Sequence, residues 1–206
     1  MTRSREIASR VARLDWDGVA RDLDDRGHAL TPAILSAGEC RALAALWRRP
    51  ERFRHHVDMA RFRLGAGEYR YFADPLPPLV VELRREAYTR LAPIANRWAA
   101  VLGEDQRYPE ELATFLARCA AQRQRQPTPL LLRYGAGGYN CLHQDLYGPI
   151  AFPLQLTVLL DRPGIDFSGG EFLLVEQRPR AQSRGQAIVL EPVSYTHLTL
   201  PTICSV

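Results

Sequence analysis

The spacing of apolar residues changes near Thr128, and this change constrains the fold more than any other feature of the sequence. Before it, apolar side chains recur at helical intervals. After it come short apolar runs separated by turn residues, the pattern typical of strands. These runs cover residues 130–134, 152–160, 171–175 and 186–190. Helices followed by a series of short strands predict an α+β fold, in which the helices pack on a sheet sandwich or barrel.

Helix boundaries are clear in the front part of the chain. Residues 15–26 place their apolar side chains on one helical face, with Asp15 suited to the N-cap and Gly27 to the C-cap. Ser36 and Glu39 form an S-x-x-E capping box, in which each residue satisfies a backbone N–H of the other. The sequence therefore predicts a second helix that starts at Ser36.

Further elements are expected between these helices and the strand-rich half. Residues 79–102 form a long helical pattern, which Pro93 should kink or split, and residues 109–123 form another amphipathic helix. Residues 28–35 indicate a short strand. Residues 62–72, rich in glycine and aromatic side chains, are typical of a hairpin or an ordered loop.

Charge and hydropathy exclude some classes of protein. The chain has 27 basic and 23 acidic side chains, a net charge of +4 that permits an acidic partner such as nucleic acid without requiring one. No run approaches the roughly 20 apolar residues of a membrane-spanning helix. Residues 1–10 lack the apolar stretch of a signal peptide. We therefore expect a cytoplasmic protein with no membrane partner, whose four scattered cysteines are free thiols.

The composition changes abruptly after Glu191. Residues 192–206 contain no charged residue, no alanine and no glycine, unlike the chain before them. Residues 193–202 are also similar to the translation of an adapter used in DNA sequencing. We therefore expect three parts: a helical front part over residues 1–127, a partial sheet core over residues 128–191, and a non-native tail over residues 192–206.

The motif that carries chemistry is His143-Gln144-Asp145. On an extended chain, residues two apart point to the same face, so His143 and Asp145 can converge on one metal ion. Two histidines and one carboxylate on one face of iron(II) leave three positions open for O₂ and a bidentate cosubstrate. An H-x-D triplet alone is also typical of a surface histidine that a neighbouring aspartate orients.

The context of this triplet resembles a known superfamily. The elements R-Y-x-x-G (133–137), H-Q-D (143–145) and G-G-E-F (169–172) occur in the order found in 2-oxoglutarate/iron(II)-dependent dioxygenases. The first two resemble AlkB-type nucleic-acid demethylases, and the third resembles prolyl 4-hydroxylases. Taken whole, the chain up to Glu191 is most similar to a bacterial group linked to oxidative demethylation of damaged DNA. The resemblance implies helices packed on an incomplete double-stranded β-helix, a cupin-like jelly roll.

Residue roles follow from the resemblance by position. His143 and Asp145 match two of the three iron ligands, and Tyr134 matches a tyrosine that hydrogen-bonds the 2-oxoglutarate cosubstrate. The cofactors implied are Fe(II), 2-oxoglutarate and O₂, with ascorbate left open as an auxiliary. The implied reaction is hydroxylation of a C–H bond, with alkylated nucleobases as one substrate class.

Two parts of the superfamily pattern are missing from the sequence. The pattern requires a distal histidine as third ligand, followed by an arginine that pairs with the far carboxylate of 2-oxoglutarate. The only later histidine is His197, within the expected tail, and no arginine follows it because the last one is Arg184. We therefore expect a chain truncated at its C-terminal side, which binds iron weakly and lacks turnover.

Several alternatives remain open at this stage. A prolyl-hydroxylase-like enzyme would act on a protein substrate, a non-catalytic cupin-like protein would only bind a metal or ligand, and a basic nucleic-acid binder would need no metal. Gln155 and Thr157 face either the cavity or ordinary packing. The run from Tyr69 to Phe72 interleaves aromatic and basic side chains, which suits either a clamp for a base or the core of the front part.

Overall fold

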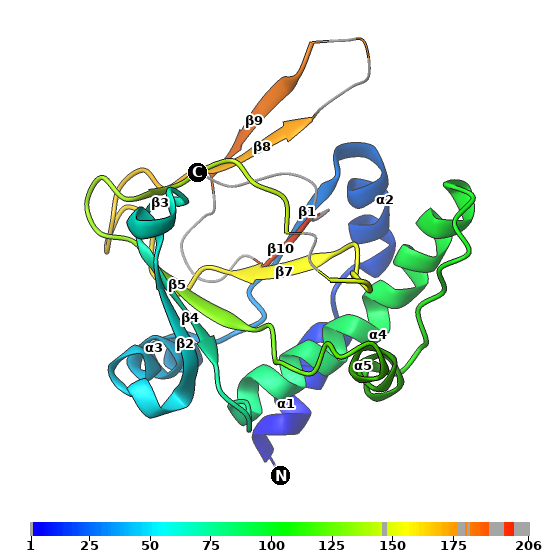
Figure 1. The fold of residues 1–206 in the computed structure, drawn as a ribbon, viewed down its shortest axis with the longest axis horizontal. Helices are drawn as coiled ribbons and strands as arrows, with labels where there is room; N and C mark the ends of the chain where they lie inside the picture. Colours follow the sequence, from blue (N-terminus) through cyan, green and yellow to red (C-terminus); the bar gives the residue numbers. More distant parts are fainter. Residues whose placement is uncertain (1, 146–147, 177–179, 181, 190–195, 200–206) are drawn as a thin grey trace.

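The computed structural model describes residues 2–145, 148–176, 180, 182–189 and 196–199. In Figure 1, helices α1, α4 and α5 lie together below a central sheet, and a second sheet stands to one side of it. Among the described helices, none is long and apolar enough to cross a membrane.

Five α-helices are described, and their boundaries follow local sequence signals. They are α1 (Thr2–Ala12), α2 (Trp16–Arg26), α3 (Ala37–Ala45), α4 (Pro78–Val101) and α5 (Leu112–Ala121). The Asp15 carboxylate accepts a hydrogen bond from the backbone N–H of Gly18, and Gly27 adopts the left-handed conformation that ends α2. Both groups of the predicted capping box are in place at Ser36 and Glu39.

Two features of the helices differ from the sequence-based picture. Of the two outcomes expected at Pro93, a split does not occur, since α4 continues unbroken to Val101. Helix α1 was not predicted from the sequence, although it buries Ile7 and Val11 at 1% exposure each. These two side chains are four residues apart and therefore share one face of the helix.

Two three-stranded antiparallel sheets dominate the strand layer. The first has the order β1-β10-β7, formed by His28–Thr31, Thr196–Thr199 and Gln155–Val158. The second has the order β2-β4-β5, formed by Phe53–Asp58, Glu68–Phe72 and Leu130–Arg133. Two-stranded ladders add β3 (Gly65–Ala66) with β6 (Tyr139–Asn140), and β8 (Phe172–Glu176) with β9 (Arg184–Ile188).

The front part of the chain, expected to be mainly helical, contains the predicted strand at residues 28–35 as β1 and two strands of the second sheet. These are β2 and β4, and β4 pairs with β5 from the strand-rich half. Short 3₁₀ helices precede and follow β2: η1 (Leu46–Arg48), η2 (Pro50–Arg52) and η3 (Met59–Phe62). Within residues 62–72, expected to be a hairpin or an ordered loop, β3 pairs with β6 and β4 pairs with the earlier strand β2.

The segment expected to be a non-native tail is described only at residues 196–199. These residues form β10, which pairs with β1 on one side and with β7 on the other. In this register His197 lies opposite Thr157 and Leu30. The remainder of residues 192–206 lies outside the described part, and the origin of the segment stays a prediction.

An aromatic cluster joins the helices to the strand layer. Tyr88 of α4 and Phe115 of α5 stack with ring centroids 5.4 Å apart, and both contact Phe152, which precedes β7. Tyr108 completes the cluster and donates a hydrogen bond of 2.9 Å to the backbone oxygen of Ala151. The cluster therefore fixes the segment that leads into β7 against the helices.

Candidate metal centre

The His143-Gln144-Asp145 triplet lies in an irregular segment just after β6. The backbone N–H of Cys141 donates a hydrogen bond of 2.7 Å to the carbonyl oxygen of Leu64, which anchors the start of this segment beside β3. The imidazole Nε2 of His143 lies 3.3 Å from the Oδ1 of Asp145. The structure therefore brings the two predicted ligands together, side by side on one segment.

Each of the two side chains is held by a further hydrogen bond. The Nδ1 of His143 lies 2.8 Å from the carbonyl oxygen of Cys141, which can only accept, so Nδ1 carries the proton. The side-chain amide of Gln155 in β7 donates a hydrogen bond of 3.2 Å to the Oδ2 of Asp145. As a result, Nε2 of His143 and Oδ1 of Asp145 are the atoms that face each other.

The electrostatics of the pair favour a charged imidazole while no metal competes for it. The hydrogen bond that the His143 imidazole donates to Asp145 raises the pKa of His143 above its ordinary value, burial opposes this rise, and the carbonyl of Cys141 adds to it. The charge of Asp145 also affects Tyr69 of β4. Burial and then the charge of Asp145 raise the pKa of the Tyr69 phenol, which stays neutral beside the carboxylate.

Tyr134, the third predicted site residue, is placed by a different contact. It follows the last residue of β5 and is 41% exposed. A Cβ atom at Gly67 would lie only 2.6 Å from the Cδ1 of Tyr134, so the ring covers the bare backbone of that glycine. Sequence reasoning did not single out Gly67, because its partner becomes visible only when β4 and β5 pair.

The aromatic–basic run from Tyr69 to Phe72 divides between the two faces of its strand. Tyr69 and Tyr71 meet edge to face with centroids 5.5 Å apart. On the other face, the guanidinium of Arg70 lies 4.3 Å from the centre of the Trp47 ring, and Phe72 stacks on Phe53. One face of this strand therefore packs against Trp47 and Phe53. The other face carries Tyr69 and Tyr71, and the charge of Asp145 affects the first of these.

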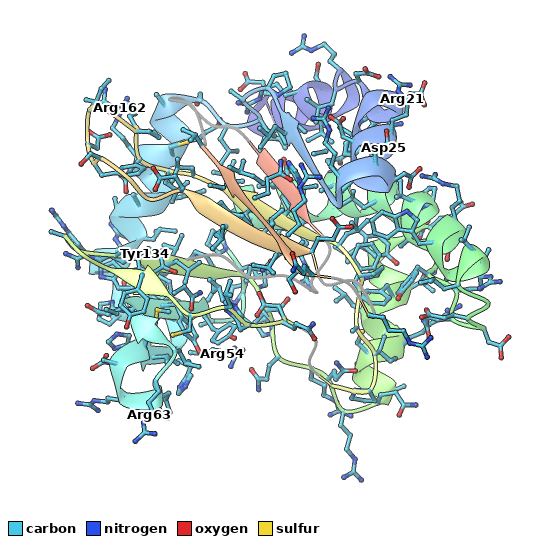
Figure 2. All side chains as sticks on the ribbon, turned by 90° about the horizontal axis from the view of Figure 1, so that it is seen from above. Arg21, Asp25, Arg54, Arg63, Tyr134 and Arg162 are labelled. Carbon is cyan, nitrogen blue, oxygen red and sulfur yellow. The ribbon has the colours of Figure 1, made fainter. Side chains whose placement is uncertain are left out.

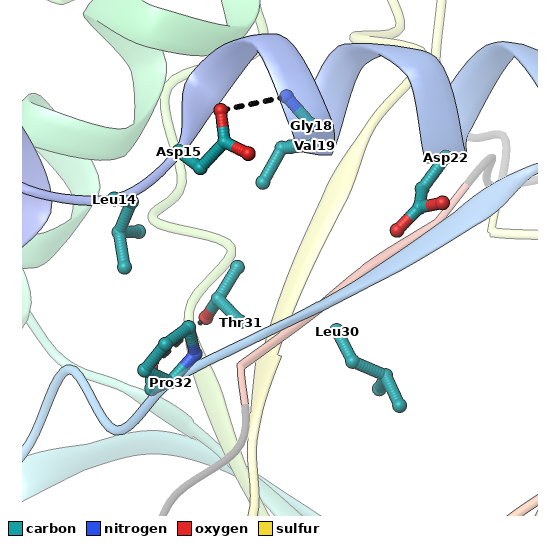
Figure 3. A pocket seen from close by; sticks show the side chains of 8 residues that line it. All are labelled: Leu14, Asp15, Gly18, Val19, Asp22, Leu30, Thr31 and Pro32. Atoms are coloured by element: carbon teal, nitrogen blue, oxygen red, sulfur yellow. Dashed lines mark hydrogen bonds between the residues drawn. The ribbon is translucent and has the colours of Figure 1, made fainter.

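No group of three histidine, cysteine, aspartate or glutamate side chains within the described ranges could hold a metal ion. The third ligand of an iron site is thus not found there, and the side chain of His197 lies outside the described residues. A hollow of about 130 Å³ between α2 and β1 (Figure 3) is lined by Asp15, Asp22 and apolar neighbours, without any predicted site residue. It is a gap beside the α2 N-cap rather than part of the metal centre.

The comparison with protein families defines the class of this chain as an oxygenase family. Residues 67–199 match the family described as "Oxygenase, catalysing oxidative methylation of damaged DNA", and the chain belongs to this family. The matched range includes Tyr134, His143 and Asp145.

Two relatives and one solved structure place the chain more closely. It is 50% identical over 119 residues to uncharacterized proteins from two strains of Mycobacterium tuberculosis, CDC 1551 / Oshkosh and ATCC 25618 / H37Rv. The alignment covers 58% of this chain and 51% of each relative, so the chain spans about half the length of the curated relatives it matches. A Pseudomonas putida prolyl-4-hydroxylase has the same fold, with a TM-score of 0.50, 16% identity and coverage of 92% of this chain and 91% of that one.

Proposed function

We propose that the natural protein is an Fe(II)- and 2-oxoglutarate-dependent oxygenase that hydroxylates a C–H bond of an alkylated nucleobase. The observation that carries this proposal is the pair of His143 Nε2 and Asp145 Oδ1, 3.3 Å apart, with the outer atom of each side chain already hydrogen-bonded. Metal-binding histidines and carboxylates in proteins are typically oriented by such outer partners.

The geometry of the pair fits two adjacent positions on an octahedral metal. Nitrogen and oxygen ligands lie about 2.0–2.2 Å from such an ion. Two of them at a right angle are therefore about 3 Å apart. The observed 3.3 Å needs only a small closure on binding. Because the proton of neutral His143 is on Nδ1, the lone pair of Nε2 is free for the metal. The Oδ1 of Asp145 is also available to the metal, while its Oδ2 stays hydrogen-bonded to the amide of Gln155.

Iron and 2-oxoglutarate, when bound, supply the oxidising chemistry with O₂, and the chain's part is to bind and orient them. Tyr134, whose ring is supported on Gly67, would donate a phenolic hydrogen bond to a cosubstrate carboxylate. We propose that the third histidine ligand and the cosubstrate-binding arginine belong to a part of the natural protein outside this sequence. Ascorbate would act only as an auxiliary reductant.

The substrate class rests on the family description together with the face that carries Tyr69 and Tyr71. Tyr69 and Tyr71, which meet edge to face with centroids 5.5 Å apart, offer aromatic contacts for a flat base. Hydroxylation of an N-methyl group gives an N-hydroxymethyl group, which releases formaldehyde and leaves the N–H of the base. We therefore propose removal of the methyl group as the outcome of oxidation.

The test measures succinate and formaldehyde from Fe(II), 2-oxoglutarate and an N-methylated oligonucleotide, using the natural full-length protein beside this chain. We expect turnover only in the full-length protein, and none after His143→Ala or Asp145→Ala. A proline-rich peptide serves as the competing substrate, because the likeness to prolyl-4-hydroxylase concerns the fold alone. Full turnover by the His143→Ala variant would overturn the proposal.

This chain has a simpler readout of the same site. We expect weak Co(II) binding, followed by its visible absorption, that disappears in the His143→Ala variant. Retained absorption in that variant would place the metal elsewhere. The experiment therefore separates a wrong metal site from a missing cosubstrate site.

A further inference from the structure

The positive charge of the chain is concentrated in one segment. Residues 47–70 contain seven arginines and three carboxylates, which amounts to the full net charge of +4 of the whole chain. The remaining residues are balanced, with twenty charges of each sign. The surplus is therefore a local feature of the stretch from η1 to β4.

Several of these arginines lie on or beside strand β2, which is at an edge of the β2-β4-β5 sheet within the described structure. Four of them are exposed and form no ion pair within the described ranges. The four are Arg48, Arg49, Arg54 and Arg63. We call these four residues the basic edge; Arg54 and Arg63 are labelled in Figure 2.

The arginines of the basic edge are not neutralised by carboxylates. None of the four forms an ion pair within the described ranges, where the segment's only such pairs are Arg61 with Asp58 and His56 with Glu68. Elsewhere in the described structure, six arginines form an ion pair with a carboxylate and others form none. The six pairs are Arg10–Glu39, Arg21–Asp15, Arg26–Asp22, Arg85–Glu86, Arg97–Asp24 and Arg162–Asp166.

One guanidinium of the basic edge is held on an aromatic ring. Arg54 lies 4.5 Å from the centre of the Tyr71 ring and donates hydrogen bonds of 3.0 and 3.2 Å to the carbonyl oxygen of Pro127. A stacked guanidinium loses little side-chain freedom when an anion binds, which favours affinity.

The basic edge adjoins the candidate metal centre through the backbone. Strand β2 pairs along its length with β4, which carries Tyr69 beside Asp145. After β2, the carbonyl oxygen of Leu64 accepts a hydrogen bond from the N–H of Cys141. The carbonyl oxygen of Cys141 in turn accepts one from the Nδ1 of His143. The basic edge and the candidate metal centre are therefore connected through paired backbone segments.

We propose that the basic edge is a docking surface for the sugar–phosphate backbone of the nucleic-acid substrate. This inference rests on the proposed function for the identity of the polymer. Unpaired arginines, each able to contact a phosphate in bidentate fashion, match a chain of regularly spaced anions. A membrane surface fits less well, because Phe62 is the segment's one large apolar side chain classed as exposed.

The experiment measures binding of a fluorescent 12-nucleotide single strand, and of the matching duplex, by anisotropy between 50 and 300 mM salt with a chelator present. The test variant carries Arg48→Gln, Arg49→Gln and Arg63→Gln, and the control carries Arg21→Gln, Arg26→Gln and Arg90→Gln. Both lose three positive charges from exposed positions. We expect at least a tenfold weaker affinity at 100 mM salt in the test variant only. Its salt slope should fall by about 2, since each lost phosphate contact removes about 0.7 for a single strand.

Three outcomes would overturn the inference: equal losses in both variants, no binding by the unmodified chain, or equal binding to anionic vesicles that compete with the oligonucleotide. Stronger binding of the single strand than of the duplex supports an unpaired substrate, and the reverse supports a duplex. Because the chelator removes any metal, failure of the iron site leaves this result unchanged. Circular dichroism of each variant checks that it folds, and Arg54→Lys, which keeps the charge, should lose less affinity than Arg54→Gln.

Discussion

Gln155 of β7 orients a candidate ligand, because its side-chain amide donates a hydrogen bond to the Oδ2 of Asp145. We predict that Gln155→Leu, which is similar in size but cannot donate, lowers Co(II) affinity about 10- to 100-fold. Gln186→Leu on β9, which changes another exposed strand glutamine, should leave it unchanged. Equal Co(II) affinity of the two variants would show that Asp145 binds the metal without a hydrogen bond from Gln155.

Gly67 is the second residue whose role depends on a neighbour. A Cβ atom there would lie 2.6 Å from the ring of Tyr134 and 3.1 Å from the backbone oxygen of Arg133. We predict that Gly67→Ala displaces the ring, costs about 1–3 kcal/mol of stability and weakens 2-oxoglutarate binding by the full-length protein. Gly135→Ala is the control, because its added Cβ meets nothing within 4 Å. Urea unfolding and cosubstrate titration measure the two effects, and a Gly67→Ala variant as stable as the control would contradict the packing.

At the residue scale, the sequence predicted two candidate ligands but not the contacts that support them. His143 and Asp145 follow from residue type and two-residue spacing, and the structure brings them together. The partners Gln155 and Gly67 depend on which strands pair, whereas the Cys141 carbonyl lies only two residues before His143. One sequence contains no local signal for contacts between distant strands, so of those two partners only Gln155 was named, without a choice between cavity and packing.

At the element scale, the link between α1 and α3 gives a pH-dependent prediction. Arg10 donates two hydrogen bonds of 2.7 Å to the carboxylate of Glu39, which also closes the capping box of α3. The hydrogen bonds from Arg10 lower the pKa of Glu39 to about 2, and burial opposes this shift. Since the folded-state pKa is depressed, the stabilisation is complete above the unfolded pKa and is lost as the pH falls towards 2.

We predict that Glu39→Gln, which keeps the capping hydrogen bonds but not the charge, lowers the free energy of unfolding at pH 7. The loss should be roughly 1–2 kcal/mol after allowance for solvent screening. Between pH 5 and pH 2 the difference from the unmodified chain should shrink, because its Glu39 then becomes protonated. Urea titrations across this range measure it. A difference that stays constant with pH would mean that the charge on Glu39 contributes nothing.

Predictability at the element scale depends on how local each signal is. The caps at Asp15, Gly27 and Ser36 were predicted correctly because their hydrogen bonds connect residues a few positions apart. The second sheet was not, since β4 pairs with β5 about sixty residues later. At Pro93 the local signal for a break in the helix is not followed, because the packing of α4 buries Leu91, Ala92 and Ile94 around it.

At the scale of the whole molecule, the segment before β7 joins the helices to the sheets, because both hydrogen bonds and aromatic contacts hold it against the helical layer. The side-chain amide of Gln124, just after α5, both donates to and accepts from the backbone of Ile150 at 2.9 Å. The ring of Phe152 lies 5.1 Å from both Tyr88 and Tyr108. Strand β7, which begins three residues later, carries Gln155 to Asp145. The helical layer therefore helps to position a candidate ligand.

Phe152→Ala tests this coupling. Removing the ring leaves a cavity among three aromatic side chains, so we predict a loss of about 2–4 kcal/mol in the free energy of unfolding. Because the cluster positions the segment leading to Gln155, Co(II) affinity should fall as well, even under conditions where the variant is fully folded. Phe62→Ala is the matched control, since that ring is 63% exposed and its loss should change stability by less than about 0.5 kcal/mol. If Phe152→Ala lowers stability but leaves Co(II) affinity intact, the metal centre is held by its own loop, and the helices only stabilise the fold.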